Sequence, residues 1–279
     1  MRCGRKGSMF TLHRVPNRGF IDSEDDQIYF ETWGDGPETV VLCHGMGGHH
    51  AVWYQQVPTL VRRYRVVTWD QRGFGRSSAN GPIGPGPAVT DLTRILDHLE
   101  VEEAHMIGQS MGGWTALGFA VENPTRTASL VLADTTAGIF DDQIRATLAA
   151  YGEQIASGPP PDAWPLGFHP AVGNQLFDED PAQSFLYGQL GSLTDPPSPF
   201  EVIEALMATD HTEPASRLAT RTLFVVGEND PIFPPALIES AATCIPGSRV
   251  EVIADTGHSP YFERPDIWND VVTRFLADS

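Results

Sequence analysis

The sequence of 279 residues predicts a fold of the α/β class, and three observations support that prediction. Seven apolar runs rich in β-branched residues recur along the chain, and most of them are nearly continuous rather than alternating with polar residues. Strands buried on both faces have this pattern, as in a parallel sheet covered by helices. Helical patterns lie between several of the runs, and alternation of strand and helix is typical of α/β proteins. The length suits one large core of this class.

The expected elements follow from the local sequence. Strands are expected at QIYFETW (27–33), TVVLCHG (39–45), RVVTWDQ (65–71), AHMIGQS (104–110), SLVLAD (129–134), RTLFVVGEND (221–230) and RVEVIADTG (249–257). A helix is expected over 90–100, where Thr90 or Asp91 is placed to cap its start. Four apolar residues share one face of that helix: Leu92, Ile95, Leu96 and Leu99. The Gly and Pro cluster at 80–87 indicates a surface loop.

The alternation of strand and helix stops after Asp134 and resumes near Thr222. The segment between them holds ten of the 23 prolines, which end helices, so several short helices are expected there. It is also acidic, because Arg145 is the single basic residue between 137 and 214 against twelve Asp or Glu. We therefore expect a helical cap at 137–214, inserted in a core domain of 21–136 and 215–279, after a disordered or strand-like lead at 1–20.

Composition argues against several classes of function. The formal net charge is −18, whereas nucleic-acid binding rests on clustered Lys and Arg, so no nucleic-acid partner is expected. No apolar run is long enough to span a bilayer, and the N-terminal MRCGRKGSMF lacks the apolar core of a signal peptide, so no membrane partner is expected. Three widely spaced cysteines argue against a disulfide framework and favour a cytoplasmic location.

The stretch HMIGQSMGG at 105–113 is a candidate catalytic element. An apolar run leads into Ser110, a helix-forming stretch follows it, and Gly108 and Gly112 flank it. Strand, sharp turn and helix in that order form a nucleophile elbow, with the serine at a helix N-terminus whose free N–H groups favour negative charge. The alternative is an ordinary turn with an inert hydroxyl.

A nucleophilic serine needs a base and a group that orients the base. His258 follows the run RVEVI, and Asp230 follows LFVV. All three residues come at the ends of expected strands, and ligand sites of such sheets form at the carboxyl ends of the strands. Asp134, at the end of SLVLAD, and Asp255, three residues before His258, are alternative acids.

Five motifs resemble those of the α/β-hydrolase superfamily: VVLCHGMGG (40–48), DQRGFGRSS (70–78), HMIGQSMGG, VVGENDP (225–231) and GHSPYFERP (257–265). The resemblance implies a mostly parallel eight-stranded sheet flanked by helices, with an inserted helical cap. It implies that Ser110 is the nucleophile, His258 the base and Asp230 the acid, since the turn GENDP matches the family. It also implies an oxyanion hole formed by the backbone N–H groups of Met46 and Met111.

This resemblance implies a serine hydrolase that cleaves a carboxylic ester or lactone through an acyl-enzyme intermediate, without a cofactor. Hydrolysis of a carbon–carbon bond in a vinylogous diketone, and a slowly hydrolysing ligand receptor, remain alternatives. The acid-rich cap favours a neutral, partly apolar small molecule. The oligomeric state stays open. Five apolar residues are candidates for the substrate pocket: Trp114, Trp164, Phe168, Tyr187 and Met207.

Three other signals are expected to be structural. The histidines at 44, 49 and 50 lack a carboxylate or thiolate at metal-binding spacing, so no metal site is expected, and His44 is interpreted as part of the oxyanion loop. The glycines of RGFGRSS lack the third glycine of a dinucleotide fingerprint. Asp70 and Arg72 are expected to form an ion pair that anchors their loop.

Overall fold

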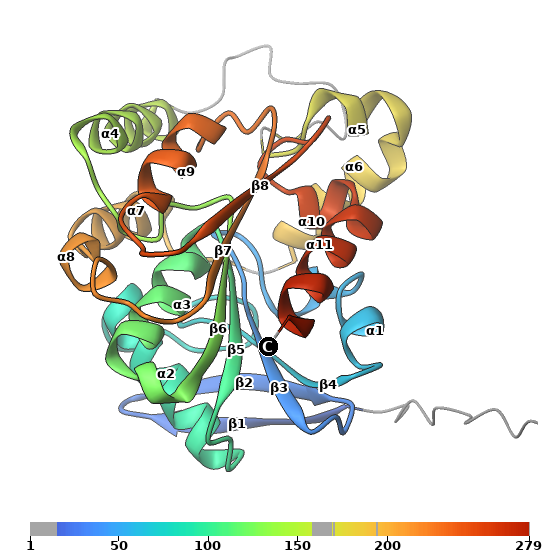
Figure 1. The fold of residues 1–279 in the computed structure, drawn as a ribbon, viewed down its shortest axis with the longest axis vertical. Coiled ribbons are helices and arrows are strands. Elements are labelled where there is room, and N and C mark those ends of the chain that lie inside the picture. Colours follow the sequence, from blue (N-terminus) through green and yellow to red (C-terminus); the bar gives the residue numbers. More distant parts are fainter. Residues whose placement is uncertain (1–15, 158–168, 170, 194, 279) are drawn as a thin grey trace, which may run out of the picture.

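The fold is built on one mixed sheet of eight strands, in the order β1-β2-β4-β3-β5-β6-β7-β8 (Figure 1). The computed structural model describes residues 16–157, 169, 171–193 and 195–278. The pairs β1–β2 and β2–β4 are antiparallel. All the other neighbouring strands, from β4 through β3 and β5 to β8, are parallel. The strands are β1 (Asn17–Ser23), β2 (Asp26–Trp33), β3 (Glu38–Cys43), β4 (Tyr64–Trp69), β5 (Ala104–Gln109), β6 (Thr127–Ala133), β7 (Thr222–Gly227) and β8 (Arg249–Ile253).

The predicted α/β class and the mostly parallel eight-stranded sheet are confirmed. A strand lies in each of the seven apolar runs, and the eighth is β1, whose sequence NRGFIDS is largely polar and exposed on the outer edge. β1 covers the end of the expected lead, and residues 1–15 lie outside the described part of the chain.

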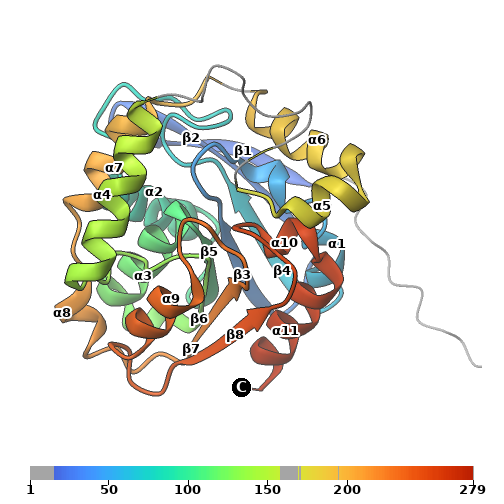
Figure 2. The ribbon, with the colours of Figure 1, turned by 90° about the horizontal axis from the view of Figure 1, so that it is seen from above.

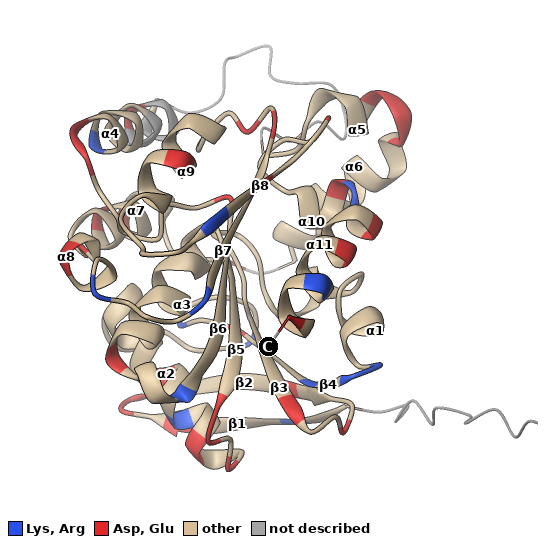
Figure 3. Ribbon diagram, in the orientation of Figure 1, with Lys and Arg blue, Asp and Glu red and all other residues tan. Residues whose placement is uncertain are grey.

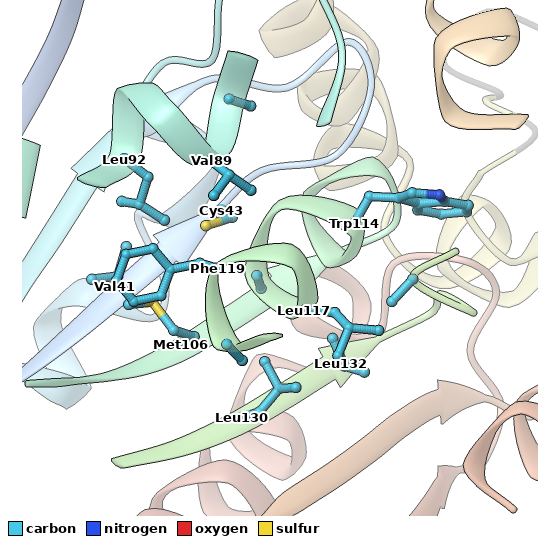
Figure 4. Packing of buried hydrophobic residues seen from close by; sticks show 14 of the residues in the cluster. Val41, Cys43, Val89, Leu92, Met106, Trp114, Leu117, Phe119, Leu130 and Leu132 are labelled. Carbon is cyan, nitrogen blue, oxygen red and sulfur yellow. The ribbon is translucent and has the colours of Figure 1, made fainter. Parts of the chain in front are cut away.

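Helices cover both faces of the sheet (Figure 2). Figures 1 and 2 show α2 (Pro85–His98), α3 (Met111–Glu122) and α9 (Pro235–Ala242) on one face, and α1 (Val57–Leu60), α10 (Pro260–Glu263) and α11 (Pro265–Ala277) on the other. Val41, Met106 and Leu130 of three neighbouring strands form one cluster with Leu92 of α2 and Phe119 of α3 (Figure 4). Full burial of each such side chain contributes about 1.5–3 kcal/mol, so the cluster fixes α3 against the sheet.

The chain between β6 and β7 forms helices in its described parts. Figure 2 shows α4, α7 and α8 on one side of the molecule and α5 and α6 on the other. These helices are α4 (Asp142–Ala156), α5 (Asn174–Glu179), α6 (Pro181–Gly191), α7 (Pro199–Met207) and α8 (Thr212–Ala215). Short helices that begin at proline agree with the pattern expected of the segment 137–214, which we call the cap.

The start of α2 corrects one prediction. The helix begins at Pro85 instead of Thr90, and Gly84 precedes it with φ 116°, a backbone conformation that glycine adopts readily. Proline is well suited to the first helical position because its missing N–H has no intrahelical partner there. The expected surface loop at 80–87 therefore ends in helix, and Asp91 lies inside α2, where it is fully buried and does not cap the start.

The expected ion pair between Asp70 and Arg72 is also wrong. Arg72 binds Asp91 through Nε and Nη2 at 2.8 and 2.9 Å, and a further bond reaches Glu24. Asp70 accepts the backbone N–H groups of His50 and Arg76 at 2.6 and 2.8 Å. The pair was predicted because the two residues are close together in the sequence, but their side chains bind different partners. Arg72 ties its loop to α2.

Candidate active site

Ser110 occupies a strained turn between β5 and α3. Its φ of 50° and ψ of −121° lie outside the regions that side chains favour. A Cβ on Gly112 would lie 2.2 Å from the backbone oxygen of Cys43, and one on Gly108 would lie 2.4 Å from the oxygen of Gly112. Only glycine permits these approaches, so α3 starts directly against β3 and presents the serine above the sheet.

Three predicted residues from separate strand ends meet in one hydrogen-bonded relay. His258 Nε2 lies 2.9 Å from Ser110 Oγ, and His258 Nδ1 lies 2.8 Å from Asp230 Oδ2. Asp230 Oδ1 accepts the backbone N–H groups of Ile232 and Phe233 at 2.8 and 3.0 Å. Because a carboxylate only accepts, it directs the imidazole proton to Nδ1 and leaves Nε2 free to accept the serine proton.

Sequence reasoning missed Glu263, which holds the loop that carries His258. Its buried carboxylate accepts the backbone N–H groups of both residues that flank the histidine, Gly257 at 3.0 Å and Ser259 at 3.1 Å. It also accepts the N–H of Gly173 in the cap, at 2.9 Å. Burial raises the pKa of Glu263, while these three donors act in the opposite direction. An acidic residue within the otherwise apolar stretch SPYFE was the available signal.

Two more contacts connect the histidine loop to its surroundings. Gln109, the residue before the serine, donates from Nε2 to the backbone oxygen of His258 at 3.0 Å. The hydroxyl of Tyr187 on α6 lies 2.8 Å from Ser259 Oγ. The position of the imidazole therefore depends on β5 on one side and on the cap on the other.

The two alternative acids lie in different environments. Asp255 is exposed on the surface. Asp134 is fully buried, accepts the N–H of Gly227 at 3.0 Å, and has one carboxylate oxygen within 4.8 Å of ligand atoms of both Asp230 and His258. Burial, and next the charge of Asp230, raise the pKa of Asp134 well above its ordinary value. Burial therefore favours the neutral form of this carboxyl, which lies next to Asp230 and His258.

This difference predicts a pH-dependent effect of Asp134→Asn on stability. Above the ordinary pKa of 3.8 the unfolded carboxyl ionises while the folded one keeps its proton, so the wild type loses stability as pH rises toward the folded pKa. The amide has no proton to lose. We expect the free energy of unfolding of the variant, minus that of the wild type, to increase by up to about 1.4 kcal/mol for each unit of rising pH in this window. Urea titrations from pH 4 upward measure it, with Asp255→Asn as control; a constant difference contradicts the assignment.

The proposed oxyanion donors, the backbone N–H groups of Met46 and Met111, lie on a loop and a helix that other contacts hold in place. Met111 is the first residue of α3, so its backbone N–H has no intrahelical acceptor. Met46 comes two residues after His44. His44 Nε2 accepts the N–H of Gln71 at 3.0 Å, and His44 Nδ1 lies 2.8 Å from the oxygen of Gly45. Burial lowers the pKa of His44 to about 4, so the ring stays neutral and uses both nitrogens to hold the loop.

The ring nitrogens of the nearby histidines 49 and 50 also contact groups of the protein. His49 accepts the N–H of Ala51 through Nδ1 at 3.3 Å and lies 3.2 Å from the oxygen of Leu190 through Nε2. His50 Nδ1 lies 2.8 Å from Asp70 Oδ1. The ligand atoms of the three residues His49, His50 and Asp70 lie within 4.8 Å of one another, so the sequence missed this carboxylate partner. The hydrogen bonds fasten the loop after β3 to the strand end of β4.

A cavity of about 320 Å³ lies above Ser110 and His258. Of the predicted pocket residues, Trp114, Tyr187 and Met207 line it, whereas Trp164 and Phe168 lie outside the described residues. Sequence reasoning missed several apolar lining residues from α4, α7 and the loop after Asp230: Leu148, Ile203, Leu206, Ile232 and Phe233. No Asp, Glu, Lys or Arg is among its described lining residues. The acidic residues of the described cap helices, coloured red along the ribbon in Figure 3, are exposed to solvent.

The structure groups a serine, a histidine and an aspartate at the carboxyl ends of parallel strands, and comparison with known proteins identifies the family. The family model described as alpha/beta hydrolase fold matches residues 38–265, and the chain belongs to this family. The protein named "Putative carbamate hydrolase RutD" from Azorhizobium caulinodans is 27% identical, over 91% of this chain and 96% of that one. The 3-oxoadipate enol-lactonase 1 of Acinetobacter baylyi is 29% identical, over 87% of this chain and 91% of that one.

A solved structure supports the same assignment. The thermophilic esterase from Thermogutta terrifontis matches with a TM-score of 0.79 and 26% identity, over 94% of this chain and 98% of that one. Together these relatives support a hydrolase of the α/β-hydrolase family that acts on a small molecule. Within the described residues, no helix has the length and apolarity required to cross a bilayer.

Proposed function

We propose that this protein is a serine hydrolase that cleaves a carboxylic ester or lactone through an acyl-enzyme on Ser110. The observation that supports it is the relay from Ser110 Oγ through His258 to Asp230, with distances of 2.9 and 2.8 Å. The relay opens into a cavity with apolar walls, which suits an uncharged, partly apolar substrate.

The chemistry follows from the positions of these groups. Ser110 Oγ attacks the carbonyl carbon while its proton passes to His258 Nε2, and Asp230 stabilises the imidazolium. The N–H groups of Met46 and Met111 receive the oxyanion, each such donor typically contributing about 2.7–4 kcal/mol. The imidazolium then gives its proton to the leaving oxygen. A water molecule, deprotonated by the same nitrogen, attacks the acyl carbon, and the proton returns to Ser110 as the acid leaves.

A second candidate bond is that of a carbamate, since one relative is named as a putative carbamate hydrolase. A carbamate carbonyl lies between nitrogen and oxygen, so the same attack and proton transfers apply to it. The carbon–carbon hydrolase and the slow receptor remain hypotheses without a specific observation in their favour. All of them require Ser110 to act as a nucleophile in at least one turnover.

A covalent label tests the nucleophile before any substrate is known. We expect a fluorophosphonate to add one phosphonyl group to the peptide that contains Ser110, and none to Ser110→Ala or to protein unfolded in urea. Intact mass and peptide mapping measure the result. A panel of esters, lactones, carbamates and diketones, analysed by mass spectrometry, then identifies the bond. Equal turnover of the preferred substrate by Ser110→Ala overturns the proposal, whereas a single slow burst favours the receptor.

A further inference from the structure

A second cavity of about 330 Å³ adjoins the catalytic one. It lies between the loop after β3, which contributes residues 45–48, and α6, and Ser110 and His258 do not line it. The residues common to the two cavities are Met46, Gly47, Gln109, His169 and Tyr187. The shared residues form the boundary between the two cavities. An ester whose carbonyl lies at Ser110 can therefore place one part in the first cavity and another part in the second.

Glycines keep the second cavity open. An added Cβ on Gly47 or Gly188 meets no atom within 4 Å, and one on Gly191 meets only the oxygen of Gly47, at 3.4 Å. Gly188 lies inside α6, where glycine costs about 1 kcal/mol relative to alanine. Its φ is not in the left-handed range, so the backbone does not require glycine. Glycine at position 188 therefore leaves open space in the cavity beside residues 45–48.

The lining of this cavity is uncharged and combines apolar surface with a few polar groups. No Asp, Glu, Lys or Arg is among its described lining residues. His169 accepts the N–H of Ala171 through Nδ1 at 3.1 Å, so the proton of the neutral ring is on Nε2. Burial lowers the pKa of His169 to about 4, which keeps the ring neutral at physiological pH. Its ring also stands edge-on against Tyr187, with centroids 4.8 Å apart. The boundary between the cavities thus carries an oriented N–H donor.

We propose that the second cavity is a substrate subsite that binds one limb of a two-limbed ester, an uncharged limb with a hydrogen-bond acceptor such as an ether oxygen. The other, apolar limb occupies the first cavity. Each volume is at the lower end of the range of about 300–1,000 Å³ for small-molecule sites, so a substrate that extends on both sides of its carbonyl uses both. This inference rests on the proposed function of Ser110.

Gly188→Leu tests the subsite, because the new side chain enters the open space. The substrates are methyl acetate, methyl methoxyacetate and 2-methoxyethyl acetate, with methyl butyrate and butyl acetate as the alkyl equivalents of the two ethers. We expect kcat/KM for one of the two ethers, relative to methyl acetate, to fall by about tenfold or more. Gln189→Leu adds the same side chain at the next, exposed position of α6, and we expect no change in these ratios.

Two further variants complete the test. His169→Phe is expected to lower the ratio of that ether to its alkyl equivalent, by about three- to tenfold for one lost hydrogen bond. Met207→Trp narrows the first cavity and is expected to reduce activity on esters extended at the opposite limb. The proposal is overturned if Gly188→Leu leaves all ratios within about twofold of wild type, or lowers every extended ester equally.

Binding separates this proposal from the proposed function. In a Ser110→Ala background, which cannot form the acyl-enzyme, the same esters are titrated against protein with and without Gly188→Leu. Weaker binding of one ether only in the double variant supports the subsite, and equal binding refutes it. Wild-type protein that hydrolyses none of the five esters refutes the choice of ester as substrate without changing the result of this binding comparison.

Discussion

Asp230→Asn is expected to lower kcat by about 10⁴-fold on the substrate that the panel identifies, as removal of this charge does in other Ser-His-Asp sites. The amide occupies the same space, so the N–H groups of Ile232 and Phe233 keep an acceptor. It can, however, donate to His258 Nδ1 and place the imidazole proton on Nε2, where the base must be free. Steady-state kinetics on folded variant, checked by circular dichroism, measures the loss.

Asp134→Asn is the matched control for this prediction. The same chemical change is made at a distant position in the sequence that lies beside the same relay. Because Asp134 accepts the N–H of Gly227 and burial raises its pKa, which favours the neutral form, we expect its amide to keep kcat within about threefold of wild type. If Asp134→Asn abolishes turnover while Asp230→Asn retains it, the acid of the relay has been assigned to the wrong residue.

The relay could be predicted from the sequence because each of its parts depends on local signals. Ser110, Asp230 and His258 each follow an apolar run, and parallel strands bring such ends to one edge. The sheet was predictable for the same reason. β1 was foreseen only as one option for the lead, disordered or strand-like, because an edge strand with one exposed face needs few apolar residues.

Other parts depend on contacts between distant segments. Arg72 was assigned the nearest carboxylate in sequence, but burial of Asp91 on α2 gave it a different partner. The pocket was predicted from large aromatic residues, whereas Leu148 and Ile203 line it because α4 and α7 converge above Ser110. The second cavity depends on glycines, and a missing side chain gives no signal in a sequence until its neighbours are known.

The cap and the loop of His258 are joined through groups that the sequence motifs did not assign. Glu263 binds Gly173 of the cap as well as both neighbours of His258, and Tyr187 of α6 reaches Ser259. A shift of the cap relative to the sheet would therefore act first on the loop that carries the base. If the proposed function holds, a substrate that contacts the cap helices would also act on the alignment of His258.

Glu263→Gln is expected to reduce kcat by about 10- to 100-fold, with a smaller effect on KM, because misplacement of a catalytic group by about 1 Å costs up to that factor. The two carboxylate oxygens accept the N–H groups of Gly173, Gly257 and Ser259. Glutamine replaces one oxygen with a donor, which faces an N–H group and leaves it without an acceptor. The loop then moves away from the position in which His258 Nε2 meets Ser110 Oγ.

A pH profile separates this positioning role from a general loss of stability. When pH falls through the raised pKa of Glu263, the wild-type carboxylate gains a proton and loses acceptor capacity, so kcat of the wild type falls in this pH range. Glutamine has no proton to gain there, so the step that Glu263 contributes to the acid limb should be absent in Glu263→Gln. Glu179→Gln, which removes an exposed partner of Arg264, is the control and should keep both features of the wild type. A variant Glu263→Gln with unchanged kcat and an unchanged acid limb would falsify the role of this carboxylate in aligning the base.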